Sequence, residues 1–192
     1  EDGNLDMALK AVVFAAIGTC GQRCTSIRRL YIHESKYEEL KNRLVHAYKS
    51  LRLGDPLDAQ NNCGPLHTKA AVKEYEEGLK TIESQGGKIV YGGRRIEDKL
   101  DGNYVYPTLV EIDPTAKIVQ EELFVPILYL FKFKCFDEAI KLNNGVPQGL
   151  SSSVFTTNMQ NVFKWIGPCG SDCGLVNVNV GTSGAEIGGA FG

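Results

Sequence analysis

Two cysteines stand four residues apart in the stretch GTCGQRCT, at Cys20 and Cys24. The thiolate is the reactive form of cysteine, and nearby positive charge lowers the pKa of a thiol. Cys24 has Arg23, Arg28 and Arg29 close to it in the sequence, and the glycine-containing loop before it can bring backbone N–H groups near its sulfur. The pattern therefore offers Cys24 as a nucleophile. On spacing alone, a buried packing cysteine is the stronger alternative.

The other cysteines raise a second kind of chemistry. Cys169 and Cys173 form another C-x3-C pair, and four thiolates can bind zinc tetrahedrally. The spacing is loose and no histidine lies near either pair, so a zinc site is the weaker hypothesis. We interpret Cys20 as a packing residue in the last turn of a helix, and Cys63 and Cys135 as buried or half-buried fillers.

Composition narrows the class of protein. The 192 residues suffice for one domain, and 21 basic against 23 acidic side chains do not indicate a nucleic-acid partner. No apolar run reaches the roughly 20 residues that a membrane span needs. Six cysteines are too few for a disulfide scaffold, so reduced thiols are expected.

The chain lacks an initiator Met and ends in a glycine run, so we expect one domain of a longer protein whose targeting region is outside it.

Helical and strand-like patterns alternate along the chain. Helices are predicted at 4–18, 35–51, 68–85, 136–144 and 158–167, and strands at 27–33, 88–93, 103–112, 126–134, 150–157 and 174–180. Pro107 places its strand at an edge or a bulge. The order predicts an α/β fold with one mostly parallel sheet flanked by helices, and it puts Cys24 on the loop after the first helix.

Four segments carry a resemblance to a known family. They are FAAIGTCGQRCTSIRRLYIH around Cys24, QEELFVP at 120–126, NNGVPQGLSSSVFTT at 143–157 and GLVNVNVGTSGAEIGGAFG at 174–192. In this order they resemble the aldehyde dehydrogenase superfamily over the whole chain. The segments GPLHTKAAV, PILYLFKFK and TSGAEIGGAFG are similar in sequence to the antiquitin branch of this superfamily, the α-aminoadipic semialdehyde dehydrogenases.

The resemblance implies that residues 1–192 are the catalytic domain of an NAD-dependent enzyme of lysine catabolism. Cys24 then attacks the aldehyde to form a thiohemiacetal, which loses a hydride to NAD and becomes a thioester. Glu122 resembles the glutamate that binds the nicotinamide ribose hydroxyls, and Phe124 is expected near the nicotinamide ring. The alternatives are a solvated glutamate and an ordinary core aromatic. The NAD-binding domain, the general-base Glu and the oxyanion-hole Asn lie outside this chain, so the fragment alone is expected to be inactive.

The same resemblance assigns the substrate side of the site. Arg23 could grip the carboxylate of an amino acid head, or it could tune the thiolate or face solvent. Thr25 could offer its hydroxyl to the substrate or cap the next turn, and Gly184 and Ala185 could offer backbone groups. Val125 stands where most of the family has Gly, which puts the fine geometry of the cofactor site in doubt.

Partners and compartment follow only from the resemblance. We expect an aldehyde as substrate and a homo-oligomer, a dimer or a tetramer, with residues 174–180 as an edge strand for contact. The expected location is cytoplasmic, with mitochondria as a second compartment. The competing interpretations are a betaine-aldehyde or other semialdehyde dehydrogenase of the same superfamily, and a non-catalytic binding domain.

Overall fold

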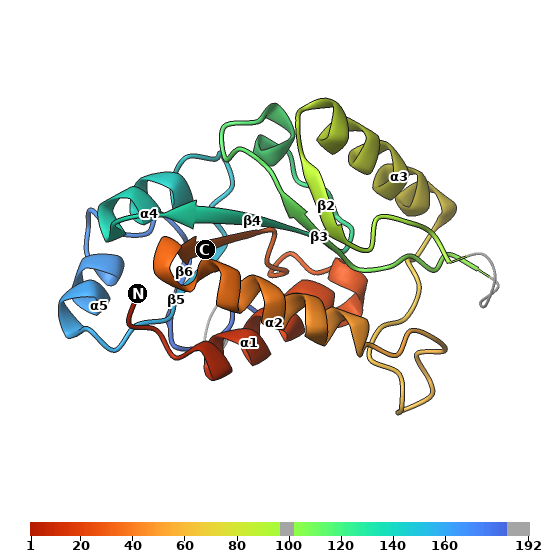
Figure 1. The fold of residues 1–192 in the computed structure, drawn as a ribbon, viewed down its shortest axis with the longest axis horizontal. Helices are drawn as coiled ribbons and strands as arrows, with labels where there is room; N and C mark the ends of the chain where they lie inside the picture. Colours follow the sequence, from red (N-terminus) through yellow and green to blue (C-terminus); the bar gives the residue numbers. More distant parts are fainter. Residues whose placement is uncertain (97–101, 184–192) are drawn as a thin grey trace.

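The structure is a computed structural model that describes residues 1–96 and 102–183. Helices and strands alternate along most of the chain (Figure 1), as predicted. In chain order the elements are α1 (Leu5–Ile17), η1 (Gly18–Gly21), β1 (Arg29–His33), η2 (Glu34–Lys36), α2 (Tyr37–Lys49), α3 (Lys69–Ser84), β2 (Lys88–Tyr91), β3 (Thr108–Glu111), η3 (Lys117–Gln120), β4 (Ile127–Phe133), α4 (Phe136–Asn143), β5 (Ser151–Val154), α5 (Met159–Ile166) and β6 (Leu175–Val178).

The described strands form two sheets. Four strands lie in the order β1-β4-β3-β2, in which β1, β4 and β3 are parallel and β2 is antiparallel to β3. The other two, β5 and β6, pair in parallel with each other. The predicted α/β class and the mostly parallel strands are confirmed, but the described strands form two sheets rather than the one sheet predicted.

Both faces of the four-stranded sheet are covered by helices. Successive side chains of a strand point to opposite faces, so β4 contributes to two apolar clusters. Leu128 and Leu130 pack in the cluster that contains residues of α1 and α2, while Tyr129 and Phe131 pack in the cluster of α3. The first five residues of β4 are buried and its end reaches the surface, as the sequence pattern indicated.

Local signals fix the ends of the helices. The side chain of Asn4 accepts hydrogen bonds from the N–H groups of Asp6 and Met7, both at 3.0 Å, and caps α1. Gly18 ends that helix, so the chain must turn before Cys24. Thr68 caps α3 in the same way through the N–H of Ala71.

Two expectations were wrong. The strand predicted over 103–112 begins only at Thr108, and it lies between β4 and β2 rather than at an edge, although its pairing with β2 does have a bulge-like register shift between Ile89 and Tyr91. Pro107 is compatible with this interior strand because it precedes the first residue of the strand. Cys135, expected to be at least half-buried, is exposed just ahead of α4.

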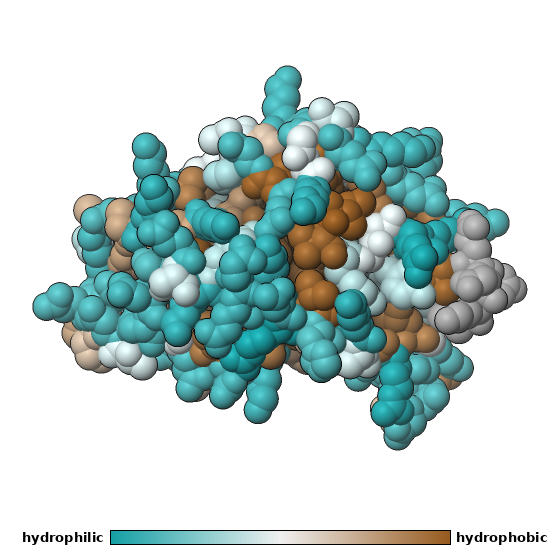
Figure 2. All heavy atoms as spheres, viewed as in Figure 1, coloured by the Kyte–Doolittle hydropathy of each residue, from teal (hydrophilic) through white to brown (hydrophobic). Residues whose placement is uncertain are grey.

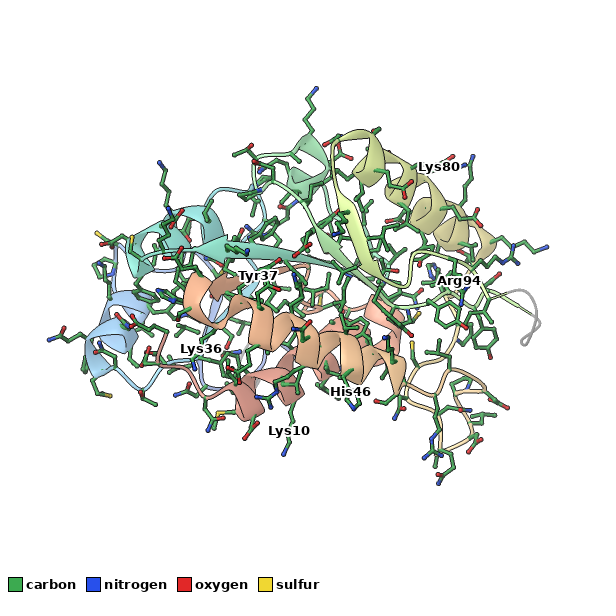
Figure 3. The ribbon with its side chains drawn as sticks, in the orientation of Figure 1. Lys10, Lys36, Tyr37, His46, Lys80 and Arg94 are labelled. Atoms are coloured by element: carbon green, nitrogen blue, oxygen red, sulfur yellow. The ribbon has the colours of Figure 1, made fainter. Side chains whose placement is uncertain are left out.

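The surface shows where the sheet is less covered. Apolar residues gather over the sheet between α2 and α3, and hydrophilic residues surround them (Figure 2). Lys10 and His46 point outward from α1 and α2, whereas Tyr37 lies where α2 begins (Figure 3). The Tyr37 hydroxyl donates to Glu111 at 2.8 Å and so ties α2 to β3. Within the described ranges, none of the helices is long and apolar enough to cross a bilayer.

Candidate active site

Cys24 lies on a loop that reverses sharply after α1. Thr19 and Cys20 have φ angles of 55° and 54°, and Gly21 follows with 68°. Left-handed backbone is uncommon for residues other than glycine, and two such residues in succession mark a constrained turn. The turn leaves Cys20 only 1% exposed in the α3-side cluster, whereas Cys24 is exposed. The packing role predicted for Cys20 is confirmed, but the residue lies in the turn after α1 rather than in the last turn of that helix.

The turn is wedged against residues 125 and 126. A Cβ on Gly21 would lie 2.7 Å from the Cα of Pro126 and 2.9 Å from the carbonyl oxygen of Val125. Only glycine fits this approach, so the GQRC and EELFVP segments meet here. Val125 itself is fully buried and is not in the left-handed region, so a valine is accommodated at a position where the family usually has glycine.

Gln22 ties the loop to a third segment, a role that the sequence analysis missed. Its side-chain oxygen accepts from the backbone N–H of His67 at 2.9 Å and lies 2.7 Å from Nδ1 of the same residue. Its amide nitrogen lies 3.4 Å from the carbonyl oxygen of Pro65. Gln22 therefore attaches the loop to residues 65–67. In the sequence, the only sign of this role is its position in the GQRC pattern.

Arg28 is a second residue whose role was missed, because the sequence showed it only as one positive charge near Cys24. One guanidinium nitrogen donates to the carbonyl of Val125 at 2.9 Å, and another lies 3.4 Å from the carbonyl of Arg23. The group lies 5.1 Å from the centroid of the Phe124 ring. Burial lowers the pKa of Arg28, opposed by the negative charges of Glu122 and then of Glu74.

A cavity of about 420 Å³ opens beside these segments. It extends between the two sheets, and Cys24, Thr25, Arg28 and Glu122 are among the residues that line it. The predicted nucleophile and the predicted ribose-binding carboxylate therefore share one cavity. Its volume lies in the range of small-molecule sites.

Thr25 connects the nucleophile loop to the chain after β6. Its hydroxyl donates to the hydroxyl of Ser183 at 3.3 Å, and its carbonyl accepts from the hydroxyls of Thr182 and Ser183 at 2.8 and 2.9 Å. Neither Thr182 nor Ser183 is predicted as a site residue from the sequence. They bring the chain beside Cys24 just before Gly184 and Ala185, which lie outside the described residues.

Arg23 turns away from the cavity. Its Nε donates to the hydroxyl of Thr19 at 2.7 Å, and its guanidinium lies 5.3 Å from the centroid of the Phe14 ring on α1. A contact between Arg23 and the substrate stays a prediction, and it would require this side chain to swing out.

The hydrogen-bond acceptors present suit an organic cofactor that carries hydroxyl groups. Glu122 is exposed, and among the described residues its carboxylate makes no hydrogen bond or ion pair, so both oxygens are open to a diol. Phe124 is not among the residues that line the cavity, and its half-buried ring lies against the guanidinium of Arg28. Over residues 1–96 and 102–183, no three His, Cys, Asp or Glu side chains converge as a metal site would require.

The fold and the site agree with a comparison against protein families. The model of the aldehyde dehydrogenase family matches residues 1–192, and the chain belongs to this family.

Particular relatives narrow the branch. The chain is 58% identical over 192 residues to a Dictyostelium discoideum homologue of aldehyde dehydrogenase family 7 member A1, covering 100% of this chain and 38% of that protein. It is 53% identical over 193 residues to the alpha-aminoadipic semialdehyde dehydrogenase of Bos taurus, covering 100% and 35%. The resemblance to this branch is confirmed, and the chain spans little more than a third of these relatives.

Solved structures agree on the fold. Betaine aldehyde dehydrogenase from Staphylococcus aureus in complex with NAD+ matches 94% of this chain and 36% of its own, with a TM-score of 0.89 and 26% identity. A 3,6-anhydro-L-galactose dehydrogenase in complex with NAP matches 100% and 40%, with a TM-score of 0.94 and 28% identity.

Proposed function

We propose that the protein carrying this chain is an NAD-dependent aldehyde dehydrogenase that oxidises α-aminoadipic semialdehyde to α-aminoadipate. The observation that carries the proposal is the shared cavity, in which the exposed Cys24 and the unpaired carboxylate of Glu122 both lie. Relatives above 50% identity that are named for this substrate, from Bos taurus and Rattus norvegicus, support the choice of aldehyde.

Cys24 supplies the step that an aldehyde needs before oxidation. Its sulfur attacks the carbonyl carbon, and the carbonyl oxygen takes a proton to give a thiohemiacetal. The backbone N–H of Cys24 can stabilise the developing oxyanion, together with a second donor from outside this chain. Loss of a hydride and a proton leaves a thioester, and water then releases the acid and returns the thiol.

The cofactor side of the cavity is assigned to Glu122 and Phe124. Bound NAD supplies the hydride acceptor. The two carboxylate oxygens of Glu122 would accept hydrogen bonds from a ribose diol, and the ring of Phe124 would limit how far the nicotinamide can move. The tight contact of Gly21 with residues 125 and 126 keeps this side at a fixed distance from Cys24.

The substrate side is assigned to Thr25 and the chain that follows Ser183. The hydrogen bonds between Thr25 and Ser183 place Ser183 beside the nucleophile loop, which supports a role for Gly184 and Ala185, the next residues in the sequence, in binding the amino acid head. Arg23 is kept as a candidate for the carboxylate of that head.

We also propose the setting in which the protein acts. Six free thiols suit a reducing compartment, which favours the cytoplasm, with mitochondria as a second location. β6 is an edge strand among those described, which suits a contact between subunits of a dimer or tetramer.

The test uses the complete protein with NAD and compares α-aminoadipic semialdehyde with betaine aldehyde. We expect NADH production with a higher kcat/KM for the first aldehyde, and a loss of at least about 1,000-fold in Cys24→Ala because the nucleophile is gone. Cys135→Ala, which removes another exposed thiol, should keep full activity. A preference for betaine aldehyde would mean that the proposed substrate is wrong. An active Cys24→Ala variant, or a wild type that is inactive on both aldehydes, would overturn the proposal in favour of a binding domain.

A further inference from the structure

We infer that Arg28 is a positioning residue, which holds the cofactor-facing segment 122–125 in register with the nucleophile loop. The inference rests on the proposed function, because it assigns Arg28 a role in NAD binding through Glu122 and Phe124.

The guanidinium joins two segments that are about a hundred residues apart in the sequence. Its hydrogen bond to the carbonyl of Val125 fixes the cofactor-facing segment, and its contact with the carbonyl of Arg23 reaches the residue immediately before Cys24. It also lies against the Phe124 ring. One planar group thus contacts both halves of the proposed site.

The electrostatics argue against a role in packing alone. A buried cation is costly unless it is compensated, and the Nε of Arg28 is buried with no hydrogen-bond partner in the part of the chain that the structure describes. Compensation comes from two carbonyls, one ring and the charges of Glu74 and Glu122. Glu74 is itself tied to this segment, because its carboxylate accepts from the N–H of Phe124 at 2.7 Å.

Arg28 and Glu122 line the same cavity without pairing. No ion pair joins the two side chains, so the carboxylate oxygens of Glu122 stay open to a diol while Arg28 binds the carbonyl of Val125. A lysine could not reproduce this arrangement, because it lacks the planar fork that reaches two carbonyls and stacks on a ring.

The experiment measures equilibrium binding to the complete protein. NAD and ADP, which lacks the nicotinamide ribose, are titrated into wild type, Arg28→Met, Arg28→Lys, Glu122→Gln and the Arg28→Met/Glu122→Gln double variant. We expect Arg28→Met to weaken NAD binding about 10-fold or more and to leave ADP binding unchanged. Arg28→Lys should fall between wild type and Arg28→Met, and the double variant should bind NAD no more weakly than the weaker single variant.

Arg29→Met is the matched control. Arg29 also donates to two backbone carbonyls, those of Leu142 and Asn143, each at 3.0 Å, but it does not bind the 122–125 segment. Its loss should lower stability and leave the Kd for NAD unchanged.

The possible failures separate the two proposals. If Arg28→Met and Arg28→Lys bind NAD like wild type while Glu122→Gln binds it weakly, the inference on Arg28 is wrong and the proposed function survives. The inference is also wrong if ADP binding falls as much as NAD binding, or if Arg29→Met weakens NAD binding equally. If Glu122→Gln has no effect, the role of Glu122 falls as well.

Discussion

The two sheets of this chain are held together in different ways. The four-stranded sheet lies between two apolar clusters, and residues such as Leu109 and Val110 at its centre are completely buried. In the β5–β6 sheet the side chains are only half-buried, with the exception of Ser152. Hydroxyls secure it instead: Ser151 donates to the carbonyl of Thr182 at 3.1 Å, and Ser152 and Ser171 lie 2.6 Å apart.

The two sides of the proposed site are therefore positioned by different kinds of contact. The nucleophile loop packs on residues 125 and 126 just before β4, so the positions of Cys24 and Glu122 depend on this close packing and on the hydrogen bonds of Gln22 and Arg28. Thr182 and Ser183, which lead to the proposed substrate side, follow β6 and depend on individual hydrogen bonds. We therefore expect the chemical and cofactor side to be rigid and the substrate side to adapt more easily.

The strongest test of the comparison truncates one leucine in each sheet. Leu109→Ala should lower the free energy of opening of β3 and β4 by about 2–5 kcal/mol, because it leaves a cavity in a fully buried cluster. Leu175→Ala on the half-buried β6 is the matched variant and should cost clearly less. Amide hydrogen exchange in the complete protein, read on peptides of each sheet, measures both costs. Equal losses would mean that the two sheets share one core.

The elements held by apolar packing could be predicted from the sequence, whereas most of the long-range hydrogen bonds could not. Periodicity placed each described α-helix and strand near its observed position but not the three 3-10 helices, and the GQRC and EELFVP motifs pointed to Cys24 and Glu122, which line one cavity. Pro107 led to the wrong prediction of an edge strand, because the sequence pattern does not show whether a proline precedes the first hydrogen-bonded residue of its strand. Gln22, Arg28 and Thr182 were missed because their partners are backbone carbonyls or N–H groups far away in sequence, which no local pattern reveals.

A smaller effect is expected from a buried polar group in the four-stranded sheet. The hydroxyl of Thr108 donates to the carbonyl of Tyr106 at 2.8 Å, accepts from the N–H of Gly93 at 2.9 Å and lies 2.7 Å from the hydroxyl of Tyr75. Thr108→Val keeps the shape but leaves these groups short of partners, and it should cost about 1–3 kcal/mol. Exchange of the β3 amides reports the loss.

The variant that matches Thr108→Val in the β5–β6 sheet is Ser152→Ala, which removes the hydroxyl contact with Ser171. We expect a cost of about 1 kcal/mol, because a typical hydrogen bond contributes that amount and Ser171 can turn to other partners. A larger loss for Ser152→Ala than for Thr108→Val would show that burial does not set the strength of polar contacts in this chain.

The smallest expected effect is a pH dependence confined to the end of β5. One carboxylate oxygen of Asp2 accepts from the hydroxyl of Thr156 at 2.7 Å and from the N–H groups of Thr157 and Asn158 at 2.6 and 2.8 Å. Burial raises the pKa of Asp2, but the hydrogen bonds from Thr156 and Thr157 together outweigh it and hold the pKa well below its usual range.

The sign of the effect follows from this depressed pKa. The unfolded carboxyl has a pKa of about 3.9, so the contribution of Asp2 is complete above that value and is lost as the pH falls below it. Asp2→Asn should reduce amide protection at Thr157 and Asn158 at pH 7 and pH 5, and its difference from wild type should shrink below about pH 4. Amides of β3 and β4 serve as the internal control, because among the described residues the hydrogen bonds of Asp2 go to Thr156, Thr157 and Asn158 and not to these strands. A difference that grows on acidification, or that spreads to β3 and β4, would contradict both the assignment to Asp2 and the independence of the two sheets.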